Sequence, residues 1–271
     1  MTAHLNARLA WRPRTLLVAA VAIAAAVAVP SVAEAATIHT EGRTPHKLLL
    51  LDDTDQTNFV TVEGSRSVVF HDTLVPIKID RVPTCMPLDP YTVSCSAVRQ
   101  VELELGIGAD VATIDSRLPV SIDGGPGNDR YNALATGGPS RVGFAGGIGL
   151  DTASYGLATT GVRVAVDLET GDGRPGDDDH IFRDVENVLG SQFDDILIGS
   201  HRTALLSGLD GNDRITGGIA EEVLSGGWGT DMIDARDGAP DSIDCGGQAL
   251  DRAVVDIGAE ASITRCAEVV G

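Results

Sequence analysis

The chain has 271 residues and a formal net charge of −19 at pH 7, and it contains 32 glycines but only 4% aromatic residues. This acidity argues against a partner made of nucleic acid or anionic lipid, because both are themselves negatively charged. A low aromatic content is unfavourable for one large globular core. A glycine-rich chain is better suited to a stack of repeats, each of which buries one aliphatic side chain. We therefore expect a repeat protein that binds no nucleic acid and does not insert into a membrane.

The N-terminus has the three parts of a secretory signal peptide. Arg8, Arg12 and Arg14 precede an uncharged apolar run over 15–29, and a small-x-small cleavage site lies at 33–35. The run is about 15 residues long, and a membrane anchor needs roughly 20. We expect residues 1–35 to be a cleaved signal peptide and the mature protein to be secreted to the extracellular side.

Residues 36–104 contain short apolar runs separated by Gly, Pro and Asp. The clearest are KLLLL (47–51), NFVTV (58–62), SVVF (67–70) and VELEL (101–105). Runs of this length with turn residues between them predict strands. The region reads as a small β lead-in that caps the stack of repeats, although about 65 residues also suffice for a compact binding module.

The four cysteines form an even set in a chain with an export signal, which predicts disulfides. Three pairings are conceivable, and we expect the local ones. Cys85 with Cys95 closes a Pro-containing loop, and Cys245 with Cys266 fastens the last segment back onto the chain.

A nine-residue repeat runs without a gap from Gly190. Its five copies are GSQFDDILI (190–198), GSHRTALLS (199–207), GLDGNDRIT (208–216), GGIAEEVLS (217–225) and GGWGTDMID (226–234). Position one is always Gly, and position eight is Leu197, Leu206, Ile215, Leu224 or Ile233. A turn followed by a short strand with one inward side chain fits this period. The sequence thus predicts an all-β fold, a parallel β-solenoid in which each repeat is half a coil.

These repeats resemble the G-G-x-G-x-D-x-U-x nonapeptides of RTX, or haemolysin-type, calcium-binding proteins. GLDGNDRIT and GGWGTDMID match well, as do the earlier segments GGPGNDRYN (124–132) and GGIGLDTAS (146–154). LGIGADVAT (105–113) is a partial copy, and GGQALDRAV (246–254) looks like a decayed one. The resemblance implies a calcium-binding parallel β-roll over 105–234, with an insertion at about 155–189 and a C-terminal cap with a disulfide over 235–271.

The resemblance also implies which side chains bind Ca²⁺. In the family, the position-six aspartates ligate the ion, and alternate repeats share an edge of the roll. Asp195, Asp213 and Asp231 then lie on one edge, while Ala204 and Glu222 make the other edge degenerate; the earlier copies supply Asp110, Asp129 and Asp151.

Elementary electrostatics supports a cation at these aspartates. Carboxylates on strands about 4.8 Å apart repel by about 3 to 4 kcal/mol at an effective dielectric of 20, and a hard divalent cation removes that repulsion. The alternative is that the aspartates only cap turns. Asp177, Asp178 and Asp179 in the insertion add either a calcium site or a solvated loop, and the sequence leaves both open.

No catalytic motif accompanies the repeats. The sequence has no G-x-S-x-G elbow, H-E-x-x-H helix, P-loop or EF-hand loop. We therefore expect a protein that is not an enzyme: an extracellular calcium-binding repeat protein that folds on meeting calcium and has a structural, matrix or adhesion role with a cell-surface or matrix partner. The alternative is a secreted hydrolase or ligand-binding protein whose site lies in the N-terminal β region or in the insertion.

Overall fold

The fold is known here from a computed structural model. It describes residues 36–40, 47–52, 56–134, 139–166, 169–256, 258–259 and 262–271, all within the unit Ala33–Gly271. The predicted signal peptide, residues 1–35, lies outside the described residues. Among the described residues, no helix has the length and apolarity needed to cross a membrane.

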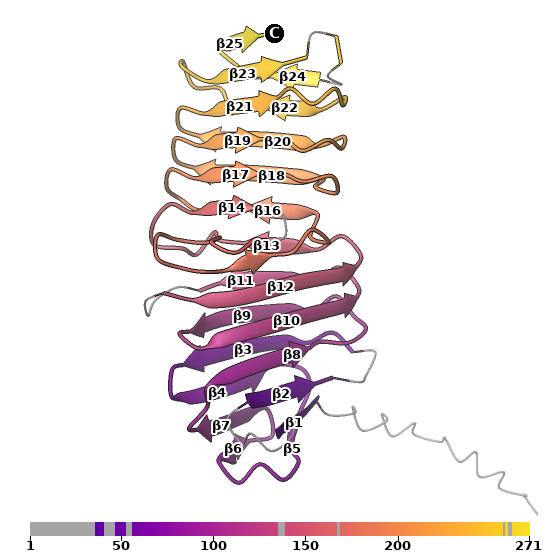
Figure 1. The fold of residues 1–271 in the computed structure, drawn as a ribbon, viewed down its shortest axis with the longest axis vertical. Helices are drawn as coiled ribbons and strands as arrows, with labels where there is room; N and C mark the ends of the chain where they lie inside the picture. The colour runs from indigo at the N-terminus through magenta and orange to yellow at the C-terminus, as the bar shows by residue number, and fades with distance from the viewer. Residues whose placement is uncertain are drawn as a thin grey trace, which may run out of the picture. The chain divides into compact units, whose positions relative to one another are not determined.

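The strands of the described chain form three sheets, here called A, B and C (Figure 1). Sheet A contains, in order, β15 (His180–Ile181), β12 (Arg141–Ile148), β10 (Pro119–Pro126), β8 (Gln100–Glu104), β2 (Lys47–Leu51), β1 (Ala36–Thr40) and β5 (Ile77–Ile79). Sheet B contains β24 (Ser262–Thr264), β22 (Ser242–Asp244), β20 (Val223–Trp228), β18 (Leu205–Asp210), β16 (Asn187–Leu189), β13 (Thr152–Ser154), β11 (Arg130–Ala133), β9 (Val111–Ser116), β3 (Phe59–Gly64), β4 (Ser67–Asp72), β7 (Thr92–Ser96) and β6 (Cys85–Asp89). Sheet C contains β14 (Arg163–Ala165), β17 (Ile196–Ile198), β19 (Arg214–Thr216), β21 (Met232–Ala235), β23 (Arg252–Val255) and β25 (Glu268–Val270).

Most pairings between these strands are parallel. The antiparallel ones, β1 with β2, β3 with β4, β4 with β7 and β6 with β7, all lie in the lead-in region. The lead-in nevertheless shares its sheets with the repeats, because β2 pairs with β8 and β3 pairs with β9, both in parallel. The prediction of an all-β fold is confirmed, and its sheets are predominantly parallel.

Alternate nonapeptides pair with each other. In sheet C, Leu197 lies opposite Ile215, and Ile215 opposite Ile233, while in sheet B Leu206 lies opposite Leu224. Each of these position-eight side chains is fully buried, whereas the preceding residue Ile196 is 43% exposed. The alternation of inward and outward side chains is the one expected for strands, and it places one aliphatic residue per repeat in the core.

At the insertion, sheet C takes the place of sheet A as the partner of sheet B. From β8 to β13, successive strands alternate between sheets A and B; from β16 onward, they alternate between sheets B and C. Within the insertion, β14 begins sheet C and β15 ends sheet A. Here the core is aromatic, since the Tyr131 ring packs 5.9 Å from Phe144 and 6.0 Å from Tyr155 between ring centroids.

Both predicted disulfides are present. Cys85 is joined to Cys95 across the paired strands β6 and β7, and Cys245 is joined to Cys266 near the end of the chain. The described chain has no free cysteine. The second bond ties the segment before β25 to the end of β22, so the last strands are held covalently as well as by pairing.

Candidate metal centres

A buried acidic residue stands immediately before each of four successive strands of sheet C. These residues, which we call the sheet C ladder, are Asp195, Asp213, Asp231 and Asp251. Each follows a turn that starts with Gly, and none is more than 2% exposed. The sequence therefore brings one carboxylate per strand to the same edge of the sheet.

Hydrogen bonds from backbone amides to side-chain carboxylates connect successive members of the sheet C ladder. The Asp195 amide donates to Asp213 Oδ1 at 2.8 Å, Asp213 to Asp231 Oδ1 at 2.9 Å, and Asp231 to Asp251 Oδ1 at 3.1 Å. Asp195, Asp213 and Asp231 thus lie along one edge of sheet C, as the resemblance to RTX repeats implied. The prediction did not include Asp251, which extends the row by one strand.

A second row of buried acids lies along sheet B. This row, which we call the sheet B ladder, contains Asp110, Asp129, Asp151 and Glu186. Amide-to-carboxylate bonds of 2.8 to 3.0 Å link Asp110 to Asp129, Asp129 to Asp151, and Asp151 to Glu186, and Asn58 bonds to Asp110 in the same way. Ala204 and Glu222 precede the next two repeat strands of this same sheet. The edge predicted to be degenerate is therefore interrupted at Ala204 and acidic on both sides of it.

The second carboxylate oxygen of most ladder residues has no donor. The Oδ2 atoms in question are buried and belong to Asp110, Asp129, Asp151, Asp213 and Asp231. Asp195 differs, because Ser191 donates its amide to Oδ2 and its hydroxyl to Oδ1 at 2.8 Å. A buried acceptor without a donor is destabilising by about 1 to 3 kcal/mol, so a ligand bound to these oxygens would stabilise the fold.

The unpartnered Oδ2 atoms of Asp129, Asp213 and Asp231 each lie near a backbone carbonyl oxygen from the neighbouring repeat, beside a glycine. A Cβ at Gly124 would meet Asp129 Oδ2 and Gly146 O, each at 2.5 Å, and one at Gly226 would meet Asp231 Oδ2 at 2.4 Å and Cys245 O at 2.6 Å. Carboxylate and carbonyl oxygens are the ligands that Ca²⁺ takes in proteins. The donor set of the ladders fits a hard divalent cation, and glycine at position one leaves the space for it.

Burial raises the pKa values of the ladder carboxyls. The pKa rises to about 7 for Asp129 and Asp213 and to about 6 for Asp110, Asp151 and Asp231, because desolvation disfavours the charged form. Repulsion between acids of one ladder adds to this, as for Asp213 between Asp195 and Asp231. The pKa of Glu222 rises further, to about 8.

These pKa shifts predict how the metal-free protein responds to pH. Groups whose pKa is raised on folding bind more protons in the folded state, so the free energy of unfolding falls as pH rises through about 4 to 8. In chelator, we expect the urea midpoint to be lower at pH 8 than at pH 5. The change should be smaller in Glu222→Gln, which removes one titrating group, and a midpoint that rises with pH would contradict the prediction.

One group of acids that could hold a metal includes residues outside the nonapeptides. Ligand atoms of Glu222, Asp237 and Asp241 lie within 4.8 Å of one another. The Glu222 carboxylate accepts the Gly218 amide, and the Glu222 amide donates to Asp241 Oδ1 at 2.9 Å. Sequence reasoning missed Asp237 and Asp241 because the nine-residue phase is lost after residue 234.

The acidic run of the insertion is occupied by contacts within the protein. Asp177 binds the Arg174 side chain and the Ser140 amide, and Asp179 accepts the Ser140 hydroxyl at 2.9 Å and the Val142 amide at 2.8 Å. Asp178 is half exposed and lies 3.7 Å from Arg141. The run therefore ties the insertion to the start of β12.

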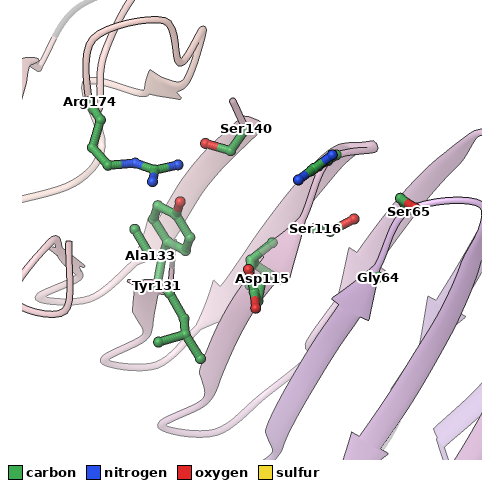
Figure 2. A pocket seen from close by; sticks show the side chains of 11 residues that line it. Gly64, Ser65, Asp115, Ser116, Tyr131, Ala133, Ser140 and Arg174 are labelled. Atoms are coloured by element: carbon green, nitrogen blue, oxygen red, sulfur yellow. The ribbon is translucent and has the colours of Figure 1, made fainter. Parts of the chain in front are cut away.

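A cavity of about 350 Å³ lies beside the insertion. Figure 2 shows Arg174 reaching toward the hydroxyl end of Tyr131, with Ser140 near both and Asp115, Ser116 and Ser65 to one side on the neighbouring strands. No histidine lines this cavity, and a second cavity in the lead-in holds His71, Glu63 and Thr92 but no serine or aspartate. Neither of the two brings together the serine, histidine and acid of a hydrolase.

Comparison with known proteins gives no assignment. No protein-family model matches the sequence, and no curated protein is significantly similar to it. The likeness to RTX repeats therefore stays a resemblance of short motifs.

Proposed function

We propose that the chain is a non-catalytic extracellular calcium-binding repeat protein of RTX type, wound as a parallel β-roll. Asp129, Asp151, Asp213 and Asp231, with carbonyl oxygens of neighbouring coils, would hold the ions. The observation that carries the proposal is the row of buried Oδ2 atoms without donors, each at a glycine turn. Bound calcium supplies the positive charge and the shared ligation that hold successive coils together.

The same acids make the roll weak when no cation is present. Each coil after the insertion buries only about two aliphatic side chains, such as Leu206 and Ile215. Against that small apolar gain stand buried carboxylates that repel one another and must be protonated or neutralised. Binding energy then becomes folding energy, so calcium orders the coils.

Export fits this chemistry. Extracellular calcium modules typically bind with Kd values of about 10⁻⁴ to 10⁻³ M, which free calcium reaches outside cells. The two disulfides are consistent with an oxidising, extracellular location. We assign the protein a structural, matrix or adhesion role in which calcium sets its rigidity.

A calcium titration of the purified protein tests the proposal. Far-UV circular dichroism in chelator should show less β structure than in calcium, and the β signal should grow as calcium is raised to about 10 mM, about tenfold above the weaker Kd values of such modules. Magnesium at equal concentration is the control, since it holds its waters and prefers a smaller octahedral site. A spectrum that is already β-rich in chelator and ignores calcium would exclude calcium-induced folding.

A further inference from the structure

A buried polar cluster lies where the lead-in meets the first repeat. Strand β2 ends at Leu51, β3 begins at Phe59, β4 ends at Asp72 and β9 begins at Val111, and pairing brings these ends to one edge of the fold. The residues at these ends are Asp52, Asn58, Asp72 and Asp110, which we call the N-terminal cluster. Their exposed fractions are 4%, 0%, 0% and 0%, respectively.

Hydrogen bonds orient Asn58 and Asp110 and leave one side-chain oxygen of each without a donor. The Asn58 side-chain amide donates to Leu105 O at 2.9 Å and to Asp110 Oδ1 at 3.2 Å, which fixes its nitrogen toward those acceptors. Asn58 Oδ1 and Asp110 Oδ2 are buried and have no donor.

Asp72 shows the same pattern from the neighbouring strand. Its Oδ1 accepts the amides of Leu74 at 2.8 Å and Val75 at 2.9 Å, and its Oδ2 is buried without a donor. Asp72 lies opposite Val60, and Asn58 is two residues before Val60, so both side chains point to the inner face of sheet B. Three unsatisfied oxygens from three strands are thus buried at one edge.

The charge of the cluster is strongly negative. Desolvation raises the pKa of Asp110 to about 6, with Asp52 and Asp72 raising it further by repulsion, and no basic group is among the causes that shift it. Gln56 O and Asp110 Oδ2 both lie about 3 Å from the point where a Gly108 Cβ would be, at 3.0 and 3.1 Å, so a carbonyl oxygen converges here as well. The chemistry offered is oxygen only, with carboxylate, amide and carbonyl donors.

We propose that Asn58, Asp72 and Asp110 form a calcium site that fastens the lead-in strands to the first repeat. The Asp52 carboxylate adds negative charge beside this site. Asn58 and Asp72 belong to no nonapeptide, and Asp110 is the one member that also belongs to the sheet B ladder. The site therefore does not depend on Asp213 and Asp231 and can exist if those bind no ion. Oxygen donors without nitrogen or sulfur select a hard cation, and the excess of carboxylates selects a divalent one.

Two variants test this site in opposite directions. Asp72→Asn keeps an oxygen for the Leu74 and Val75 amides but removes the charge and the orphaned Oδ2. Asn58→Asp adds a carboxylate, which raises the charge available to calcium. In chelator it destabilises the cluster, because a carboxylate oxygen then faces Leu105 O and Asp110 Oδ1. Asp123→Asn, at an exposed acid, is the control for net charge.

Native mass spectrometry counts calcium per chain, and hydrogen exchange follows residues 59–64 in calcium and in chelator. We expect Asp72→Asn to lose one ion and to lose the calcium-dependent protection of β3, whereas Asp213→Asn with Asp231→Asn loses other ions and leaves β3 protected. Asn58→Asp should weaken β3 protection in chelator and restore it in calcium.

An unchanged ion count in Asp72→Asn, or an Asn58→Asp protein that calcium does not rescue, would overturn the site. If the repeats bind no calcium, one ion sensitive to Asp72→Asn but not to the repeat variants would still support it. The failure of this site and the failure of the proposed function are therefore distinguishable.

Discussion

The double variant Asp213→Asn with Asp231→Asn is expected to lose most of the stabilisation that calcium gives the coils after the insertion. Asparagine keeps an oxygen to accept the amides of Asp195 and Asp213, so the backbone bonds along the ladder survive. It removes two negative charges and two orphaned ligand oxygens. At calcium a hundredfold above Kd, each lost site is worth about 2.7 kcal/mol, so two sites amount to about 5 kcal/mol.

The sign of the effect in chelator separates a metal site from a turn cap. Without calcium, the double variant should be at least as stable as the wild type at pH 8, because it removes buried carboxylates that repel each other. Urea unfolding in calcium and in chelator measures both effects. Asp80→Asn with Asp123→Asn, at exposed positions, matches the change in charge and should alter neither midpoint by much. Equal destabilisation in both media would mean that the acids only shape the turns.

The periodic part of the chain could be predicted because its pattern is local. A nine-residue period with Gly at position one and Leu or Ile at position eight specifies a turn, a strand and one inward side chain, and Leu197, Leu206 and Ile215 are buried accordingly. That Asp195, Asp213 and Asp231 share an edge was implied by the resemblance to RTX repeats, in which alternate repeats lie on the same edge. Both disulfides could also be predicted from local spacing, since each joins cysteines within 21 residues of each other.

The remaining acids of the ladders could not be predicted from a fixed interval between residues along the sequence. Strand pairing, rather than a fixed interval, puts Glu186 in line with Asp151 across 35 residues of insertion. Asp241 and Asp251 stand in coils of 19 and 20 residues, where the nine-residue phase is already broken. A signal was still present, since each of these acids directly precedes an apolar-centred strand of three or four residues.

The N-terminal cluster was hidden for a different reason. Asn58 and Asp110 are 52 residues apart and meet through the parallel pairing of β3 with β9. Asp72 joins them only because β4 turns back antiparallel to β3. The lead-in contains no repeat whose phase could have indicated these contacts. It is the sharing of sheets A and B between lead-in and repeats that turns three unrelated polar residues into one buried group.

Replacing Gly227 with alanine is expected to be among the most damaging single changes in the repeats. Its φ is +112°, a left-handed conformation that disfavours any Cβ, and the new Cβ would lie 1.9 Å from the Leu209 carbonyl oxygen of the adjacent coil. The left-handed backbone alone costs about 1 to 2 kcal/mol, and overpacking against backbone costs about 1 to 3 kcal/mol or more. We therefore expect a loss of roughly 2 to 5 kcal/mol, the sum of these two effects, measured by urea unfolding in calcium.

Two matched glycines divide that loss into its causes. Gly238 has a φ of +87° but nothing within 4 Å of its ideal Cβ, so Gly238→Ala should show the backbone cost alone. Gly143 lies in strand β12 with no left-handed φ, and the nearest atom to its Cβ is Phe182 Cε2 at 3.6 Å, so Gly143→Ala should change stability by less than about 0.5 kcal/mol. If Gly227→Ala cost no more than Gly238→Ala, the coils would be free to move apart at this turn. The close stacking that brings carboxylate and carbonyl oxygens of successive coils together would then not be enforced by the glycines.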